Sequence, residues 1–460
     1  MTQRITIVGA GLVGCLLGAM LAKRGYRVEI FERRSDMRSM EMSAGRSINL
    51  ALSDRGLRAL HAAGLADDIR AIAIPMRGRI THDVQGTQAF YPYGVGDQAI
   101  NSVSRGELNK TLLSCAERNG ARISFDMRCT DVELNSGKAV FQKSDSHPPV
   151  ESESDVLIGA DGAFSAVRDY MMRGCERFDY SQSFLEHGYK ELHIPAGPDG
   201  EFLLDKNALH IWPRHSYMMI ALPNLDGSFT CTLFFPHEGS PSFQQLTSPE
   251  KVSEFFALQF PDAVPLMPSL LEDYFFNPQS SLVTIRCSPW TSGGKVMLIG
   301  DAAHAIVPFY GQGMNAGFED CRILLECLEA TNDDWGAAMS LFEELRQPAA
   351  NAIADLAVDN FVEMRDKVAD ADFLLRKKIE AYLFATYPDK FVPLYTMVTF
   401  SSDVPYNEAQ RVSREQTLLM DSLMKIPSVA TNWTCTEAKQ HIEEVMLKRK
   451  AIVFASGSPT

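Results

Sequence analysis

The first thirty residues of the chain alternate between short apolar runs and glycine turns. Apolar and β-branched residues fill Ile5–Val8 and Val28–Phe31. Between them lie a turn, Gly9–Gly14, and a helix-like run, Cys15–Lys23, which a second turn at Gly25 ends. Buried strands joined by a helix pack into parallel sheets with helices on their faces. The pattern therefore predicts a βαβ unit at the start of the chain.

Two later apolar runs, Val156–Gly159 and Val296–Ile299, continue this parallel-strand pattern. Residues 44–118 have a mixed pattern that predicts helices and loops. The stretch Ser144–Asp155 is polar and contains proline, which is typical of a turn joining two hairpin strands. The parallel-sheet domain is thus expected to be built from separate parts of the chain.

From about Gly188 to Thr284 the pattern changes to short β-like runs separated by turns. The runs are Leu209–Trp212, Met218–Leu222 and Phe229–Phe235, followed by a Ser-, Pro- and Gln-rich loop over 239–250. Closely spaced short strands predict an antiparallel sheet, here inserted into the parallel domain. After residue 314, apolar residues recur at three- and four-residue spacings, which predicts helices almost to the C-terminus.

The composition is that of a folded protein with more than one domain: 460 residues, 45% hydrophobic and 22% charged. A net charge of -14 disfavours a nucleic-acid partner, because like charges repel. Nine scattered cysteines without a CxxC pair indicate free thiols and no metal site. No apolar run approaches the ~20 residues of a membrane-spanning helix, and the early strand leaves no room for a signal peptide. We expect a cytoplasmic protein.

The opening turn contains the spacing GxGxxG, formed by Gly9, Gly11 and Gly14. Glycines at these positions let the backbone approach a pyrophosphate, whose charge the following helix N-terminus stabilises. Glu32 ends the second predicted strand, at the distance expected for an acid that binds a ribose. The alternative is a glycine turn that only packs a helix on a strand. The surrounding strand and helix favour dinucleotide binding.

Two further motifs follow predicted strands. Gly159–Arg168 contains Asp161 at a strand-to-helix junction, where an acid is often only a helix cap. Gly300–His304 places Asp301 at the end of another strand, and Gly311–Asn315 supplies glycines before the next helix. A carboxylate there can accept from a sugar hydroxyl, and a helix N-terminus stabilises a group that gains negative charge.

The three motifs, in this order and separation, resemble those of the group A flavoprotein monooxygenases. The resemblance implies one tightly bound FAD, with NADPH as a transient co-substrate and O2 as the oxidant. The chain agrees in having no second GxGxxG. The residues that match the family's cofactor-binding positions are Gly9, Gly11, Gly14, Glu32, Arg105, Asp161, Asp301, Gly313, Met314 and Asn315.

Patterns and resemblance together predict an α/β fold class: a Rossmann-like FAD-binding domain with an inserted antiparallel-sheet substrate domain and a helical C-terminal region. The FAD-binding domain is expected to be discontinuous, over residues 1–75, 100–180 and 285–345. The substrate domain is expected over 76–99 and 181–284. The helical region, 346–460, is expected to cover the substrate pocket.

Several shorter blocks resemble the branch of this family that hydroxylates L-kynurenine to 3-hydroxykynurenine. They are residues 45–52, 76–79, 187–192, 209–213, 359–364 and 394–400. An arginine grips a carboxylate with two charge-assisted hydrogen bonds. The resemblance gives this role to Arg79, helped by Tyr93, Asn360 and Tyr395, with Glu363 facing the ammonium group. The aromatic slot would be formed by Leu209, Met218, Ile220, Leu222, Phe234, Pro308 and Phe309, each of which would equally fit an ordinary core.

The same resemblance implies a mechanism in which NADPH reduces FAD and O2 forms a flavin C4a-hydroperoxide. The distal oxygen then passes to the ring carbon ortho to the amino group. That carbon is already electron-rich, so no catalytic base is assigned, and the protein must supply positioning and a dry site. The residues beside the flavin would be Pro308, Phe309, Tyr310, Gly311 and Gln312. Family members commonly carry Phe or His where this chain has Tyr310.

The reaction would belong to tryptophan catabolism and to pyridine nucleotide biosynthesis. Alternatives are a related hydroxylase for another carboxylate-bearing aromatic, a halogenase or reductase on the same scaffold, and a flavin-binding regulator without turnover. The halogenase motif WxWxIP is missing, since the nearest segment is Ile211–Arg214. The C-terminal residues 434–460 are amphipathic and charged, so we expect no membrane anchor. Association into a homodimer is left open.

Overall fold

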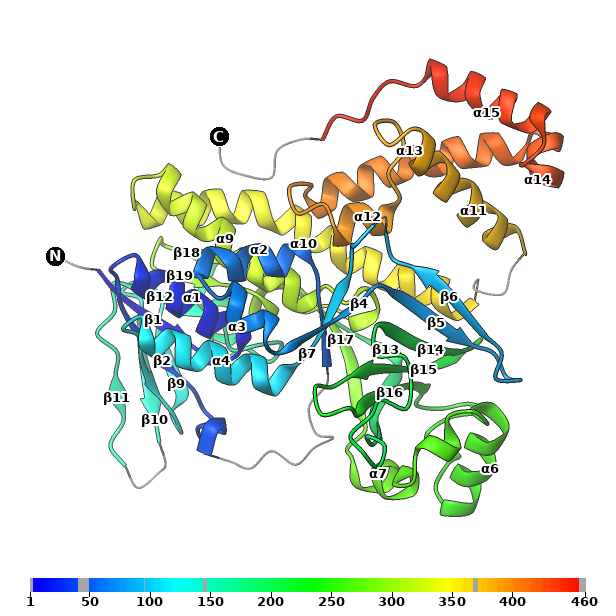
Figure 1. Ribbon diagram of the computed structural model, residues 1–460. Helices are drawn as coiled ribbons and strands as arrows, with labels where there is room; N and C mark the ends of the chain where they lie inside the picture. The colour runs from blue at the N-terminus through cyan, green and yellow to red at the C-terminus, as the bar shows by residue number, and fades with distance from the viewer. Residues whose placement is uncertain (1–2, 40–48, 95, 144–146, 367–370, 455–460) are drawn as a thin grey trace.

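The computed structural model describes residues 3–39, 49–94, 96–143, 147–366 and 371–454. Within these residues the chain forms two main sheets that lie side by side, with long helices running across both (Figure 1). The first four residues of the block 45–52 lie outside the described part.

The predicted βαβ unit is confirmed. It consists of β1 (Arg4–Val8), α1 (Leu12–Lys23) and β2 (Arg27–Phe31), and β1 pairs with β2 in parallel. The helix begins three residues earlier than expected, inside the glycine motif. β12 (Val156–Gly159) and β19 (Val296–Leu298) extend the same sheet in parallel, as the apolar runs predicted. The order of this parallel sheet is β18-β19-β12-β1-β2-β8, with β18 at Thr291–Ser292 and β8 at Arg122–Ser124.

A small hairpin sheet stands beside the parallel sheet. It pairs β9 (Arg128–Glu133), β10 (Lys138–Gln142) and β11 (Val150–Glu151) in antiparallel fashion. β10 ends at Gln142 and β11 begins at Val150, so the first part of the polar stretch 144–155 connects two hairpin strands as predicted, with its residues 144–146 outside the described part. Residues 150–151 of the same stretch form β11 itself.

Residues 44–118 contain more strand than predicted. They form β3 (Asn49–Leu52), β4 (Ala73–Met76) and β7 (Ile100–Ser104), paired in the order β3-β7-β4. The prediction of helix and loop was wrong here because each strand is short, β3 and β7 carry polar residues, and β4 carries a proline. The helices of this region are α2 (Asp54–Ala63), α3 (Ala66–Arg70) and α4 (Arg105–Arg118), and the single turn η1 (Met37–Ser39) lies before it.

The second main sheet has the strand order β17-β13-β16-β15-β14-β5-β6. Its strands are β5 (Gly78–His82), β6 (Gln88–Pro92), β13 (Asp179–Ile194), β14 (Ala208–Arg214), β15 (Tyr217–Pro223), β16 (Phe229–Pro236) and β17 (Ser280–Ser288). We call it the mixed sheet, because β5 and β14 pair in parallel while the other pairs are antiparallel. The prediction of a purely antiparallel sheet was wrong at this one pair.

One face of the mixed sheet packs on α6 (Pro249–Gln259), η2 (Val264–Leu266) and α7 (Leu270–Phe276), seen at the lower right of Figure 1. Trp212 and Phe235 from the sheet share a buried core with Phe256 from α6. Burying such side chains stabilises the layer by roughly 1.5–3 kcal/mol each. The opposite face is free to line a cavity.

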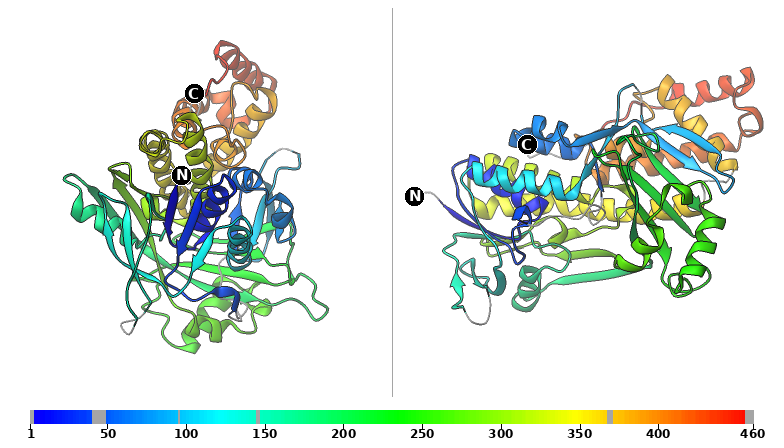
Figure 2. Two further views of the ribbon diagram at one scale, coloured as in Figure 1. Left: turned by 90° about the vertical axis from the view of Figure 1, so that its left-hand side faces the viewer. Right: turned by 60° about the horizontal axis from the view of Figure 1, so that its bottom comes forward.

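The chain is helical after residue 314, as predicted, and the helical part begins earlier, at Asp301. Its elements are α8 (Asp301–His304), η3 (Pro308–Tyr310), α9 (Gly313–Ala330), α10 (Trp335–Asp366), α11 (Ala371–Thr386), α12 (Leu394–Thr399), α13 (Tyr406–Met424), α14 (Pro427–Asn432) and α15 (Thr436–Lys448). The long helix α10 contacts β18 of one sheet and β14 of the other, and Figure 2 shows it running lengthwise through the molecule. Among the described helices, none combines the length and apolar composition that crossing a membrane requires.

Candidate active site

A cavity of about 790 Å³ connects the two main sheets. We call one part the turn half, because turns that follow strands line it through Gly9, Glu32, Asp161, Asp301 and Gly313. We call the other part the sheet half, because strands and helices line it through Arg79, Tyr93, Met218, Phe234 and Tyr395. One continuous space is therefore lined by predicted cofactor-binding residues and by predicted substrate-binding residues.

The glycine turn leaves no room for side chains. Gly9 has φ +104°, and a Cβ there would lie 2.6 Å from the carbonyl oxygen of Ala160. A Cβ on Gly14 would lie 2.0 Å from the carbonyl oxygen of Gly9, so Gly14 lets α1 approach the turn without lining the cavity. No side chain caps the N-terminus of α1 at Gly11. Its positive end therefore faces the cavity, as anion binding requires.

Glu32 organises the same turn. Its Oε2 accepts from the backbone N–H of Ala10 at 2.9 Å, and its Oε1 accepts from the backbone N–H of Arg34 at 2.9 Å and the Nε of Arg34 at 2.8 Å. Burial would raise the pKa of Glu32, but the hydrogen bonds and charge of Arg34 outweigh it and lower the pKa. The carboxylate is thus ionised and fixed at the cavity wall.

Asp161 lines the cavity and caps a helix at once. It accepts from the Oγ of Ser165 at 2.6 Å and from the backbone N–H of Ala166 at 2.7 Å, the first residue of α5 (Ala166–Gly174). The capping alternative is therefore realised. Burial raises the pKa of Asp161 against the opposing effect of these hydrogen bonds.

Asp301 begins α8 and presents its carboxylate to the cavity. Protein surrounds its other sides, and this burial raises its pKa, while His304 and Arg105 act in the opposite direction. The preceding residue, Gly300, donates its backbone N–H to Asp320 at 3.2 Å. The turn that carries Asp301 is therefore held in place by the buried carboxylate of Asp320.

The loop before α9 is tied down by Asn315. Its Nδ2 donates to the carbonyl oxygens of Ala51 and Gly311, both at 2.8 Å, and its Oδ1 accepts from the backbone N–H of Ser53 at 2.9 Å. Asn315 is fully buried and does not line the cavity, whereas Gly313 and Met314 do. No side chain caps the N-terminus of α9, so this helix also faces the cavity with its positive end.

The sheet half contains an arginine without an acidic partner. Arg79 on β5 is partly buried and lines the cavity. Among the described residues, no carboxylate lies within ion-pair distance of it. Tyr395 stacks between Tyr93 and Tyr310, with ring centroids 5.4 Å and 5.7 Å away. Burial raises the pKa of all three phenols, so they stay protonated and can donate hydrogen bonds.

The apolar wall follows the alternation of the mixed sheet. Leu209, Met218, Ile220, Leu222 and Phe234 line the cavity as predicted, with Pro308 and Phe309 from η3. Ile211, Thr232 and Tyr189 line it too, and sequence reasoning missed them. The period of two along each strand could have found Ile211 and Thr232, because both are paired with Ile220 across neighbouring strands.

Two predicted substrate residues lie on α10. Asn360 lines the cavity and donates its Nδ2 to the carbonyl oxygen of Phe309 at 2.8 Å. Glu363 does not line the cavity and lies 3.7 Å from the Nζ of Lys377. Phe361, between them, stacks on Phe309 with ring centroids 4.2 Å apart. Helix α10 therefore supports the η3 wall in addition to reaching the cavity.

The chain contains the residues that an FAD molecule would need. The tight glycine turn, the uncapped N-terminus of α1 and the buried Glu32 fit its diphosphate and adenosine half, and Asp301 fits its sugar-like chain. The uncapped N-terminus of α9 fits the flavin ring, which gains negative charge on reduction. Within the described residues, no group of three or more His, Cys, Asp and Glu could hold a metal ion. The geometry is that of an organic cofactor site.

Comparison with known proteins agrees with this reading. Residues 2–208 and 279–357 match the family model described as an FAD binding domain. The chain is 49% identical over 445 residues to the kynurenine 3-monooxygenase of Flavobacterium psychrophilum, covering 97% of this chain and 99% of that protein. It is 47% identical over 454 residues to the kynurenine 3-monooxygenase of Myxococcus xanthus, covering 98% and 95%.

Among solved structures, the tetrameric form of 2-methyl-3-hydroxypyridine-5-carboxylic acid oxygenase is similar with a TM-score of 0.66. The sequence identity is 21%, and the match covers 82% of this chain and 95% of that one. This likeness supports the fold. The full-length similarity to the relatives above and the match to the family model show that the chain is an FAD-binding monooxygenase of the kynurenine 3-monooxygenase family.

Proposed function

We propose that this protein hydroxylates L-kynurenine to 3-hydroxykynurenine, with FAD bound in the turn half and NADPH and O2 as co-substrates. The observation that carries the substrate assignment is Arg79. A partly buried guanidinium lines an otherwise largely apolar chamber, and no described carboxylate pairs with it. A cation in such a place favours a ligand that brings its own carboxylate.

The residues around Arg79 suit an amino acid attached to an aromatic ring. The protonated phenols of Tyr93 and Tyr395 can donate to the same carboxylate as Arg79. The ring would lie along the apolar face of the mixed sheet, between Met218 and Phe234. Glu363 on α10 lies close enough to Tyr310 for its charge to add to burial in raising the pKa of that phenol, and we propose that the same charge favours the substrate's ammonium group.

Bound FAD supplies the transfer of hydride from NADPH and the activation of O2. The chain's own contribution is positioning and exclusion of water. Phe309 packs between Phe234 and Phe361, at centroid distances of 4.9 Å and 4.2 Å, so the η3 part of the cavity wall is apolar and closely packed. Asn360 fixes the carbonyl of Phe309 at this wall. The substrate ring is already electron-rich, so its hydroxylation needs no protein base. What the protein must supply is orientation of the ring and exclusion of water.

The test is NADPH oxidation by the FAD-loaded protein with and without L-kynurenine, combined with mass analysis of the product. We expect kynurenine to accelerate oxidation and to gain one oxygen atom. If it does neither, the substrate assignment is wrong. A panel of other carboxylate-bearing aromatics in the same assay distinguishes the alternative hydroxylase, and no turnover with any of them would favour the flavin-binding regulator.

We also propose that the protein acts in the cytoplasm and forms a homodimer. All nine cysteines are free thiols, which suits a reducing compartment. Fractionation of cells and light scattering of the purified protein test these two points. Recovery outside the cytoplasm or a monomeric mass would contradict them.

A further inference from the structure

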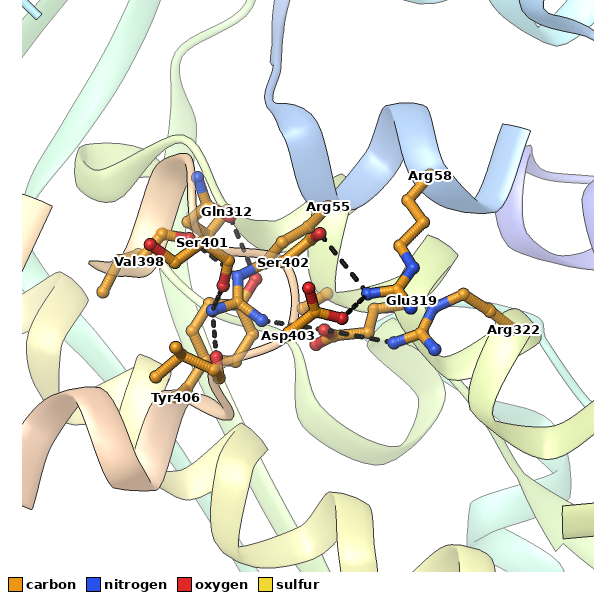
Figure 3. Close-up of polar contacts among 12 residues, drawn as sticks. Arg55, Arg58, Gln312, Glu319, Arg322, Val398, Ser401, Ser402, Asp403 and Tyr406 are labelled. Carbon is orange, nitrogen blue, oxygen red and sulfur yellow. Dashed lines mark hydrogen bonds and ion pairs between the residues drawn. The ribbon is translucent and has the colours of Figure 1, made fainter. Parts of the chain in front are cut away.

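Arg55 on α2 is a fully buried arginine that holds the backbone of a distant segment (Figure 3). Its Nε donates to the carbonyl oxygen of Val398 at 2.7 Å, and its Nη2 donates to those of Met397 at 3.1 Å and Ser401 at 3.2 Å. Nη2 also donates to the carbonyl oxygen of Val404. One guanidinium therefore binds four carbonyl groups of residues 397–404.

Two of these carbonyls belong to the last turn of α12, where a helix has no internal donors left. Arg55 supplies those donors and so acts as a C-terminal cap from another part of the chain. Helix α12 is short and carries Tyr395, whose ring lies in the cavity between Tyr93 and Tyr310. The position of this tyrosine thus depends on how the end of α12 is held.

The charge of Arg55 is balanced at the flavin side. Its Nη1 pairs with the Oε1 of Glu319 at 2.8 Å, and Glu319 lies on α9, whose N-terminus lines the cavity. Arg346 pairs with the other oxygen of Glu319 at 2.7 Å. Burial would raise the pKa of Glu319, but the nearby arginines outweigh it and lower the pKa. The carboxylate is therefore ionised, and the buried cation is compensated.

A second contact leads from the same place to the cavity. The guanidinium carbon of Arg55 lies 4.1 Å from the ring centroid of Tyr406, the first residue of α13. The phenol of Tyr406 donates to the Oε1 of Gln312 at 2.9 Å, and both side chains are buried. Gln312 lines the cavity and precedes α9. Arg55 and Tyr406 together thus join the Tyr395 side of the cavity to the Gln312 side.

From these contacts we infer that Arg55 is a positioning residue of the reaction, which fixes Tyr395 against the flavin-binding layer and, through Tyr406, fixes Gln312. The inference rests on the proposed function for its kinetic consequence, but the clamp itself does not depend on the substrate. Substitution of Arg55 is expected to weaken substrate binding and coupling while the cofactor turns, which do not contact Arg55, keep FAD.

The first experiment compares Arg55→Lys with Arg58→Lys in the FAD-loaded protein. Arg58 lies one turn further along α2 and pairs with Asp403 of the same segment, but at the surface, where ion pairs contribute little. Lysine keeps a charge beside Glu319 but cannot reach four carbonyls. We expect amide hydrogen exchange in residues 394–406 to rise about ten-fold, and KM for kynurenine to rise by about the same factor, only in Arg55→Lys.

Each outcome of this experiment supports or overturns the inference. Unchanged exchange in a folded Arg55→Lys protein would show that the clamp does not exist. Faster exchange with unchanged KM and unchanged product per NADPH would make Arg55 structural only and overturn the inference. If the wild-type protein does not hydroxylate kynurenine, the proposed function fails, while hydrogen exchange still tests the clamp.

Tyr406→Phe is the second variant, and it tests the inference even in the case that Arg55→Lys does not fold. It removes one hydroxyl and keeps the ring beneath Arg55, so the fold should be retained. We expect KM to change less than about two-fold, while 3-hydroxykynurenine formed per NADPH falls about three-fold, because Gln312 loses its donor. Wild-type coupling in this variant would overturn the link to Gln312, and with it the inference.

Discussion

The turn half and the sheet half of the cavity are made of different things. In the turn half, the binding groups are backbone and carboxylates carried by turns that directly follow strands, as at Gly9, Asp161 and Asp301. In the sheet half they are side chains from three separate parts of the chain, Arg79, Asn360 and Tyr395. A site built on local turns requires glycine and a fixed backbone, whereas a site built from separate elements requires that those elements be held in place.

The supports of the two halves differ in the same way. Under the turn half, Asp320 accepts from His304 and from Arg346, at 2.6 Å and 2.7 Å. Burial would raise the pKa of Asp320, but the charges of His304 and Arg346 outweigh it and lower the pKa to about 2. This support should resist acid. The sheet half depends instead on two buried histidines, His82 of β5 and His210 of β14.

The largest expected effect is the loss of FAD from the turn half while the sheet half is unchanged. Asp301→Ala removes a carboxylate that faces the turn half, and we expect the protein to lose FAD during purification and to be colourless. Arg79 and the sheet are untouched, so the fold should persist. Flavin absorbance per mole of protein is the measurement, with circular dichroism as the control for folding. A yellow, fully loaded Asp301→Ala protein would contradict the assignment.

The next effect should fall on the sheet half alone. Arg79→Ala removes a charge-assisted, two-pronged contact, so KM for kynurenine should rise about 100-fold, which corresponds to about 3 kcal/mol. FAD content should equal that of the wild type. Arg79→Lys is the matched control and should recover only part of the affinity. If Arg79→Ala loses its flavin instead, Arg79 belongs to the cofactor site.

How far the sequence could predict each half follows from this difference. Gly9, Glu32 and Asp301 could be found because a local motif contains both the turn and the neighbouring strand. The parallel pairing of β5 with β14 could not, since the two strands are far apart in sequence and period-two patterns do not give strand direction.

The roles of side chains were harder to predict than their places. Arg79 and Tyr395 were identified only through a family resemblance, because a lone arginine or tyrosine carries no local signal. Arg55 was not identified at all. Nothing in the sequence around it indicates that its partners are carbonyl groups of residues 397–404.

The histidine support of the sheet half is a row of three close polar contacts. His82 lies 2.7 Å from Asp262 and 2.9 Å from His210, and the far nitrogen of His210 lies 2.9 Å from the carbonyl oxygen of Asp205. Both ends of this row are acceptors. Burial lowers the pKa of His210 to about 4, which keeps that ring neutral.

Acid should consequently weaken the sheet half first. The folded pKa of His210, about 4, is below its unfolded value of about 6.5, so the unfolded state binds more protons between these values. Stability is complete above about pH 6.5 and is lost as the pH falls toward 4, by about 2 kcal/mol at pH 5. Urea unfolding at pH 7 and pH 5 measures the loss. His210→Gln keeps one donor and one acceptor without titrating, and an equal loss in that variant would refute the assignment.

The smallest effect is expected at Tyr310, which lies where the two halves meet. Its ring stacks on Tyr395 and is buried, and burial raises the pKa of its phenol, so the group is neutral. Tyr310→Phe keeps this stacking and should change KM and product per NADPH by less than about two-fold, whereas Tyr310→Ala should reduce coupling several-fold by opening the dry wall. Steady-state kinetics with product analysis measure both. If Tyr310→Phe lost coupling as strongly as Tyr310→Ala, the hydroxyl of Tyr310 would have a role in the reaction. The residue between the two halves would then act through its hydroxyl as well as through its packing.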